Sequence, residues 1–322
     1  MNLEKLTKQA VQAAREAGEV IRFHQDREVE VLHKEGGDTY ASQVVTEVDR
    51  KAQDAILSIL GPSCEECDIA LLTEENEDDG SRFEKEAFWC IDPMDGTLPF
   101  IRKEPGYSVS IGLVAKDGST RIGVVYDPVC DVLWQATKGN GVRRNGEPWT
   151  LNAGGKELTF TYDRSFADRP ERDRVLRELE DYAQSVGLKK LVALQFGGAV
   201  VNACHALENG PGCHFKFSKP QEGGGSLWDY AATACLYEEA GGVVSDVHGE
   251  PLDLNRQLAW FLSRGASSGT DGGSKDALQR HESRSQQPVV KDGLLAAAAG
   301  GGATTSGARV DFALLDSLGR DE

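Results

Sequence analysis

The chain has 322 residues, and its 52 acidic side chains outnumber its 35 lysines and arginines, giving a formal net charge of -17. A surface of this sign offers no counter-charge to nucleic acid or to an anionic membrane, which argues against either as the main partner. The length suffices for one large or two medium hydrophobic cores.

The first 150 residues predict helices followed by short strands. Apolar residues at helical spacing indicate helices over residues 3–23 and 50–60. Apolar or alternating runs indicate strands at 108–115, 121–126 and 132–136. Because these strands follow one another beside helices, we expect an antiparallel sheet with helices packed against it.

From about residue 151 the chain alternates strands and helices. The expected strands are at 158–162, 191–193, 213–217 and 242–245, and the expected helices at 169–186, 199–208 and from 228 onward. This alternation is typical of an α/β arrangement. We therefore expect two halves, residues 1–150 and 151–264.

The remaining segment, residues 265–322, has a different composition. Residues 265–307 are rich in Gly, Ser and Ala and lack apolar periodicity. We expect a low-complexity, disordered tail with one candidate short helix at 311–318.

Cysteine use and apolar content bear on the compartment. Seven scattered cysteines are typical of a reducing compartment. Cys64 and Cys67 form a lone C-x-x-C motif without a second pair or clustered histidines, so zinc or redox chemistry is not favoured there. No stretch reaches the roughly 20 apolar residues that span a bilayer, and the acid-containing N-terminal helix is unlike a transit peptide. We expect a cytoplasmic protein.

The ten residues 91–100, IDPMDGTLPF, carry the strongest chemical signal. The proline favours extended backbone before it and Gly96 allows a tight turn, so Asp92 and Asp95 are expected to project the same way at a strand end. The carbonyl of Met94 adds a third hard oxygen. Such oxygens suit Mg²⁺, Mn²⁺ or Ca²⁺ rather than zinc, although Asp-Pro and Asp-Gly are also ordinary turn formers.

The same turn offers an anion cradle. If a helical turn starts after Asp95, the amides of Gly96 and Thr97 face a bound phosphate, as amides at helix N-termini do.

Further acids end or open other predicted elements. Asp49 closes the segment VVTEVD, Glu74 and Glu75 end the apolar run of LLTEE, and Asp229 opens a helix. Taken singly, each has a structural explanation, such as a helix cap or a first-turn acid.

Together these segments resemble the inositol monophosphatase superfamily of magnesium-dependent, lithium-sensitive phosphatases, which includes the 3'(2'),5'-bisphosphate nucleotidases. The matching segments are VVTEVD, the Glu-Glu pair, IDPMDGT, the hairpin-like 123–146 and the segment 228–252, in the family's order. Asp-Pro-x-Asp-Gly-Thr followed by Trp-Asp is a specific signal. The resemblance covers residues 1 to about 262. It implies a mixed α+β and α/β fold, a layered α-β-α-β-α sandwich of the inositol monophosphatase and fructose-1,6-bisphosphatase type, with the site between the halves.

The resemblance also assigns roles to residues. The implied ligands of two or three Mg²⁺ ions are Glu74, Asp92, the carbonyl of Met94, Asp95 and Asp229. Glu75 is the less favoured acid of its pair. Asp49 and Thr97, with Glu74 through a third and weaker ion, would orient and activate the attacking water. Two cations about 4 Å apart can stabilise both the attacking and the leaving oxygen of a displacement at phosphorus.

The residues that would contact the substrate are less determined. Gly198 and Ala199 resemble the family's substrate-side turn, and a plain helix start explains them too. Glu222 lies seven residues before Asp229, where inositol monophosphatases carry an inositol-binding Glu, and an exposed loop acid is an equal interpretation. The candidate cations for a second phosphate are Lys219, Lys216 and Arg164.

Three functions stay open. The preferred one is a magnesium-dependent phosphatase of inositol monophosphate or a related small polyol phosphate. The alternatives are a nucleotidase of adenosine 3',5'-bisphosphate and a catalytically inactive protein that binds metal or sugar phosphate, the latter motivated by the unusual tail. The expected partner is a small phosphorylated substrate, not nucleic acid or a membrane, with a homodimer as a possibility.

Overall fold

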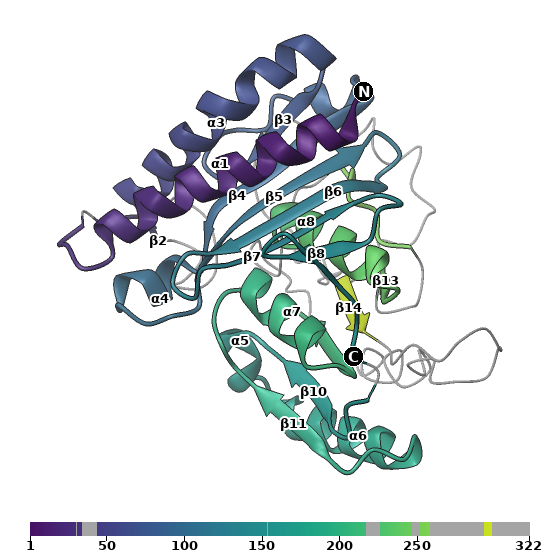
Figure 1. The fold of residues 1–322 in the computed structure, drawn as a ribbon. Helices are drawn as coiled ribbons and strands as arrows, with labels where there is room; N and C mark the ends of the chain where they lie inside the picture. Colours follow the sequence, from purple (N-terminus) through teal and green to yellow (C-terminus); the bar gives the residue numbers. More distant parts are fainter. Residues whose placement is uncertain are drawn as a thin grey trace, which may run out of the picture.

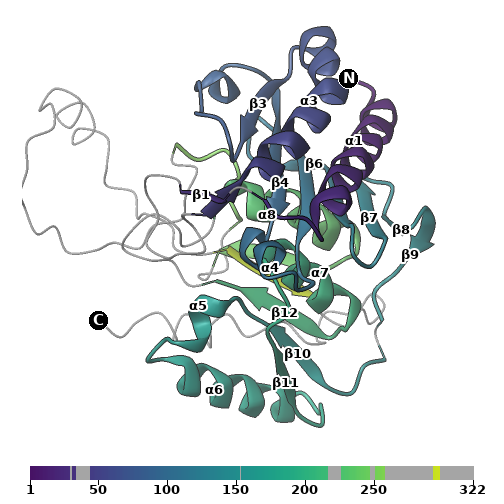
Figure 2. The ribbon, with the colours of Figure 1, turned by 90° about the vertical axis from the view of Figure 1, so that its left-hand side faces the viewer.

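The computed structural model describes residues 1–29, 31–33, 44–152, 154–216, 226–246, 251–257 and 293–297. Within these residues, helices and sheets alternate in five layers (Figures 1 and 2). Helices α1 (Leu3–His24) and α3 (Glu47–Cys67) cover one face of a seven-stranded sheet. Helices α7 (Ala199–Glu208) and α8 (Leu227–Glu239) lie between this sheet and a five-stranded sheet, and α6 (Arg172–Ser185) covers the far side. The expected α-β-α-β-α sandwich is confirmed.

The seven-stranded sheet has the strand order β3-β4-β5-β6-β7-β8-β9. Its strands are β3 (Ala70–Thr73), β4 (Ala87–Asp95), β5 (Ser108–Ala115), β6 (Thr120–Asp127), β7 (Val132–Thr137), β8 (Val142–Arg144) and β9 (Glu147–Trp149). Neighbours are antiparallel, as expected, except β3 and β4. That pair is parallel because residues 74–86, which include η1 (Ser81–Phe83), cross back over the sheet.

The five-stranded sheet has the order β11-β10-β12-β14-β13. Its strands are β10 (Leu158–Thr161), β11 (Leu191–Leu194), β12 (Gly212–Phe215), β13 (Val243–Asp246) and β14 (Gly293–Ala297). The expected helix 169–186 corresponds to α6, and a separate short helix, α5 (Arg164–Ala167), precedes it with Asp163 as its N-cap. A separate two-stranded sheet pairs β1 (Val31–His33) with β2 (Val44–Thr46).

Strand β14 comes from the segment that was expected to be a low-complexity tail. It pairs antiparallel with β12 on one side and β13 on the other, so residues 293–297 belong to the fold. A five-residue strand inside a Gly- and Ala-rich segment has no periodicity to reveal it, and its pairing is set by distant strands. The candidate helix at 311–318 lies outside the described residues.

Helix α3 is longer than its sequence pattern indicated. It begins at Glu47 because the side chains of Thr46 and Asp49 form a capping box, and it continues through Pro62 to Cys67. The Gly61-Pro62 dipeptide therefore does not end the helix, although a proline usually does. The C-x-x-C motif consequently lies in the last turn of α3, with both cysteines free and half-buried.

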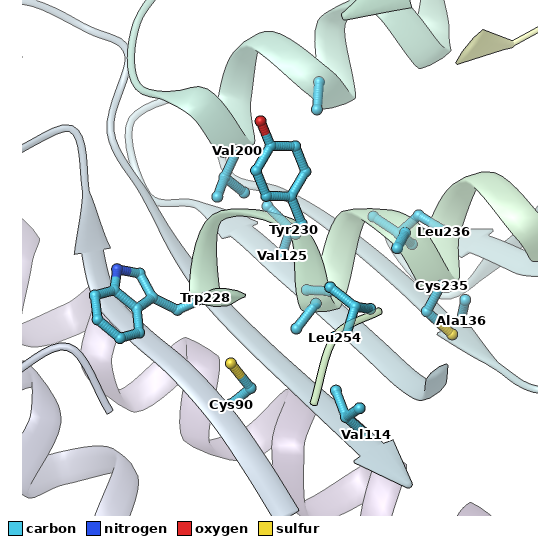
Figure 3. Packing of buried hydrophobic residues seen from close by; sticks show 14 of the residues in the cluster. Cys90, Val114, Val125, Ala136, Val200, Trp228, Tyr230, Cys235, Leu236 and Leu254 are labelled. Carbon is cyan, nitrogen blue, oxygen red and sulfur yellow. The ribbon is translucent and has the colours of Figure 1, made fainter. Parts of the chain in front are cut away.

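Helix α8 packs on the seven-stranded sheet through two glycines. A Cβ on Gly123 would lie 2.2 Å from the carbonyl oxygen of Ala232, and one on Gly112 would lie 2.7 Å from the Cβ of Ala231. Figure 3 shows side chains of α8, including Tyr230, beside residues of the sheet and of α7. This close approach fixes α8, and with it the acid in its first turn, against the sheet.

No helix in the described part of the chain has the length and apolar content that crossing a bilayer requires.

Candidate metal centre

Three buried carboxylates meet at the junction of the two sheets. Asp92 and Asp95 come from the end of β4, and Asp229 from the first turn of α8. One oxygen of each lies within 4.8 Å of the others, and among the described residues this is the only such group of possible ligands. The two acids of the turn do project the same way, as the sequence suggested.

Asp92 lies at a local irregularity near the end of β4. Asp92 Oδ1 accepts a hydrogen bond from the amide of Met94 at 3.0 Å, and the register of β4 against β5 shifts between Asp92 and Asp95. The amide of Glu74 donates to the carbonyl of Ile91 at 3.1 Å, which holds Glu74 next to this turn. Burial, followed by the charges of Glu74, Asp95 and Asp229, raises the pKa of Asp92 well above its ordinary value.

Asp95 is held by the N-terminus of α7. Its two carboxylate oxygens accept hydrogen bonds from the amides of Ala199 at 3.1 Å and Val200 at 2.8 Å. A Cβ on Gly198 would lie 2.3 Å from Asp95 Oδ2, so only glycine leaves room for this carboxylate. Burial and the charge of Asp229 raise the pKa of Asp95 to about 7. The turn expected at the substrate, Gly198 and Ala199, thus contacts an acid of the cluster.

Asp229 combines a capping role with an ion pair. Its Oδ2 accepts from the amide of Ser226 at 3.0 Å and lies 3.2 Å from the ammonium of Lys216. Lys216 Nζ also lies 3.5 Å from a carboxylate oxygen of Asp163. Burial alone would lower the pKa of Lys216, but the charges of Asp229 and Asp163 raise it above its ordinary value. Lys216 is therefore a largely buried cation paired with two acids.

Asp49 and Thr97 form a hydrogen-bonded pair beside the cluster. Thr97 Oγ1 donates to Asp49 Oδ1 at 3.0 Å and lies 3.4 Å from the carbonyl oxygen of Met94. Asp49 Oδ2 accepts from the amide and the hydroxyl of Thr46, at 2.7 and 2.6 Å. Burial raises the pKa of Asp49 to about 6 against the lowering effect of these hydrogen bonds.

The start of α4 (Thr97–Ile101) directly follows the acids of β4. Gly96 adopts φ 93°, and a Cβ there would lie 2.6 Å from the carbonyl oxygen of Gly106. The amide of Thr97 therefore opens a helical turn directly after the acids, where helix amides lack intrahelical acceptors. Of the other expected contacts, Arg164 is exposed at the start of α5, whereas Glu222 and Lys219 lie outside the described residues.

The sequence pattern left two features of the site unrecognised. Asp49 and Asp229 occupy the same position in two capping boxes, Thr46-x-x-Asp49 and Ser226-x-x-Asp229. This spacing is visible in the sequence and would have moved the expected start of α3 from residue 50 to Glu47, whereas the start of α8 near residue 228 was expected. The second feature is the side chain of Asn202, which hydrogen-bonds to the loop before α7. No local sequence signal indicates it, because its partners, such as the amide of Phe196 and the carbonyl of Tyr162, are backbone groups that only the fold brings together.

The donor set fits a hard divalent cation. Buried carboxylates that repel one another and hold raised pKa values are stabilised by a bound positive charge. Oxygen-only ligands at close spacing suit Mg²⁺ or Mn²⁺ better than zinc.

Known proteins share both the sequence pattern and the fold. The family model "Inositol monophosphatase family" matches residues 2–271. Inositol monophosphatase 1 of Mus musculus is 31% identical over 253 residues, covering 76% of this chain and 84% of the relative. The Nus factor SuhB of Pseudomonas aeruginosa is 33% identical over 249 residues, covering 74% and 84%. The crystal structure of the extragenic suppressor protein suhB of Bartonella henselae superposes with a TM-score of 0.65 at 21% identity, covering 98% of this chain and 99% of that one. The chain belongs to the inositol monophosphatase family.

Proposed function

We propose that the protein is a magnesium-dependent phosphomonoester hydrolase that acts on inositol monophosphate or a related small polyol phosphate. The observation that carries this proposal is the group of three buried carboxylates, Asp92, Asp95 and Asp229, beside the pair of Asp49 and Thr97. Membership of the family and the name of the mouse relative support the reaction and the substrate class.

The cluster would hold Mg²⁺ through oxygen atoms only. The proposed ligands are the three aspartates, the carboxylate of Glu74 and the carbonyl of Met94. When bound, Mg²⁺ supplies positive charge that binds a phosphate dianion and lowers the pKa of water. The remaining steps depend on how the chain's own residues hold the water and the phosphate.

Thr97 would position the attacking water. Its hydroxyl proton is directed at Asp49, so the lone pairs of Oγ1 can accept a hydrogen bond from the water. Asp49 is fixed by Thr46 on its other oxygen, which keeps its acceptor oriented. Because the pKa of Asp49 is about 6, its carboxylate is largely ionised near neutral pH and can accept a proton through this pair.

The amides of Gly96 and Thr97 would bind the phosphate oxygens, as amides at the start of a helix bind anions. The amides of Gly198 and Ala199 already donate to the carbonyl of Gly106 at 2.8 Å and to Asp95 at 3.1 Å. We therefore propose that Gly198 and Ala199 contribute space for the substrate and not hydrogen bonds.

A nucleotidase of adenosine 3',5'-bisphosphate is the second candidate, and the observation that favours it is Lys216. An ammonium has three donors; Lys216 donates to Asp229 and forms an ion pair with Asp163. A remaining donor would serve a second phosphate at the edge of the cluster. The pairing with two acids weighs against this role, because most of the positive charge is already balanced.

The decisive experiment measures phosphate release from both substrates with and without Mg²⁺. We expect magnesium-dependent release, and Asp92→Asn should lower it by two orders of magnitude or more, since it removes a charge from the centre of the cluster. Glu75→Gln is the matched control, because it neutralises the acid next to Glu74 and should retain activity within a few-fold. Phosphate release without metal, or full activity of Asp92→Asn, contradicts the proposal of a magnesium-dependent hydrolase with Asp92 as a ligand. A wild-type protein that binds Mg²⁺ but releases no phosphate from either substrate favours the inactive binding protein.

Glu222→Gln separates the two substrates. A carboxylate that accepts hydrogen bonds from ring hydroxyls contributes roughly 1–2 kcal/mol, so the KM for inositol monophosphate should rise from a few-fold to tens-fold. Hydrolysis of the bisphosphate nucleotide should stay the same or improve, because a negative charge has been removed. An equal change in kcat/KM for both substrates, or no change, makes Glu222 an ordinary loop acid.

A further inference from the structure

The loop of residues 195–198 connects β11 to α7 and contacts the first half of the chain. The amide of Gly198 donates to the carbonyl of Gly106 at 2.8 Å. A Cβ on Gly197 would lie 2.2 Å from the same carbonyl oxygen, so the two backbones touch directly. The conformation of this loop decides where the first amides of α7 point, and those amides hold Asp95.

The side chain of Asn202 binds this loop from inside. Its Oδ1 accepts from the amides of Phe196 at 2.9 Å and Gly197 at 3.3 Å. Its Nδ2 donates to the carbonyls of Gly197 at 2.9 Å and Tyr162 at 3.2 Å. Because a side-chain amide has two donor hydrogens and two acceptor lone pairs, the hydrogen-bonding capacity of Asn202 is fully used. The residue is fully buried, so water cannot substitute for any of these bonds.

We infer that Asn202 is a positioning residue for Asp95. The connection runs from the side chain of Asn202 to the loop backbone, then to the amides of Ala199 and Val200, and from them to both oxygens of Asp95. Asn202 is neither one of the proposed metal ligands nor one of the proposed substrate contacts. It fixes the loop, and the fixed loop sets the orientation in which Asp95 meets the other two carboxylates. The inference rests on the proposed role of Asp95 as a metal ligand.

A purely structural role for Asn202 makes a different prediction, and Thr161 provides the comparison. Thr161 is also fully buried, and its hydroxyl donates to the backbone carbonyl of Asn202 at 2.8 Å. Thr161→Val therefore removes a buried hydrogen bond to the same residue but leaves the hydrogen bonds between the Asn202 side chain and the loop in place. If Asn202 only stabilises the fold, the two substitutions should affect metal binding alike.

The test is calorimetric titration of the full-length protein with Mg²⁺ alone and with Mn²⁺ alone. In Asn202→Ala the dissociation constant should rise about tenfold or more, whereas in Thr161→Val it should stay within twofold of wild type. Asn202→Asp keeps the acceptor oxygen and loses both donors. It should raise the constant at least threefold, which gives a second measurement if the alanine variant does not fold. An unchanged constant in a folded Asn202 variant, or an equal rise in Thr161→Val, overturns the inference.

The wild-type protein gives a measurement that needs no variant. Since the metal and the loop share Asp95, saturating Mg²⁺ should slow amide hydrogen exchange in residues 196–202, and unchanged exchange there counts against the inference. These measurements follow metal binding and not catalysis. A protein without phosphatase activity can therefore still support the role of Asn202, and an active one can still contradict it.

Discussion

The hydroxyl of Thr97 donates a hydrogen bond to Asp49 at 3.0 Å, although 48 residues separate the two in the sequence. Asp49 belongs to the first turn of α3 and Thr97 opens α4, so the bond joins the outer helical layer to the end of β4. The Asp49 carboxylate is therefore shared between a helix cap and the candidate site.

Thr97→Val tests the catalytic side of this pair. The substitution keeps the shape of the side chain but removes the hydroxyl, so kcat should fall about 10²-fold, at the low end of the range for positioned proton-transfer groups. Thr97→Ser retains the hydroxyl and should keep most of the activity. Steady-state kinetics of both variants, with thermal unfolding as a check on the fold, distinguish the roles. Equal activity of the valine and serine variants would show that the hydroxyl does not act in the reaction.

The raised pKa values of Asp49 and Asp95 predict how the metal-free protein responds to pH. Folding raises the pKa of Asp49 from 3.8 to about 6 and that of Asp95 from 3.8 to about 7. Between about pH 4 and 7 the native state thus binds more protons than the unfolded state, so these groups lower the free energy of unfolding as pH rises.

Urea denaturation in the presence of a chelator at pH 5 and pH 8 measures this effect. The contribution of these groups to the free energy of unfolding should be lower at pH 8 than at pH 5. Adding Mg²⁺ should restore the free energy of unfolding at pH 8. In Asp95→Asn, the difference between the two pH values should be smaller. If Asp95→Asn shows the wild-type pH dependence, the Asp95 carboxyl does not titrate in this range.

The packing of α8 predicts a strong effect at Gly123. Gly123→Ala places a Cβ 2.2 Å from the carbonyl of Ala232, so α8 must move away from the sheet. Overpacking of this kind costs about 1–3 kcal/mol, and metal affinity should fall because Asp229 lies in the same helix. Gly61→Ala is the control, since nothing lies within 4 Å of its Cβ and it sits inside α3. It should be neutral or stabilising by roughly 0.5–1 kcal/mol. Equal effects of the two substitutions on urea denaturation would contradict this account.

The sequence pattern predicted the bounds of those elements whose own residues show an apolar run or helical spacing along their whole length. The bounds expected for β5 and α7, 108–115 and 199–208, agree with the structure because an apolar run or helical spacing extends to each end. The end of α3 was not predictable in the same way, because the helix continues through Pro62, a residue that usually ends a helix.

In the candidate site, too, some features follow from local sequence and others depend on the fold. The turn of Asp92 and Asp95 follows from local backbone chemistry, and the resemblance to a family indicated which distant acids to expect beside it. The pairing of Lys216 with Asp163 and Asp229 depends on three separate elements that meet only in the folded chain. Neither periodicity nor turn chemistry contains that information.

Strand β14 predicts the consequence of shortening the chain. Truncation after Arg264 removes residues 293–297 and leaves β12 and β13 without their shared neighbour. At about 1 kcal/mol for each net hydrogen bond, the loss should lower the free energy of unfolding by several kcal/mol. Metal affinity should change as well, because Lys216 directly follows β12 and its ammonium contacts Asp229.

Truncation after Ala299 is the matched control, because it removes the chain end but keeps β14. Leu295→Pro in the full-length chain removes one amide from the centre of the strand, where it faces His214 and Val244, and should resemble the longer truncation in a milder form. The measurements are urea denaturation and Mg²⁺ titration of all three proteins. The protein ending at Arg264 could instead unfold at the wild-type urea concentration and bind Mg²⁺ with wild-type affinity. In that case the five-stranded sheet does not need β14, and the folded unit ends near residue 264.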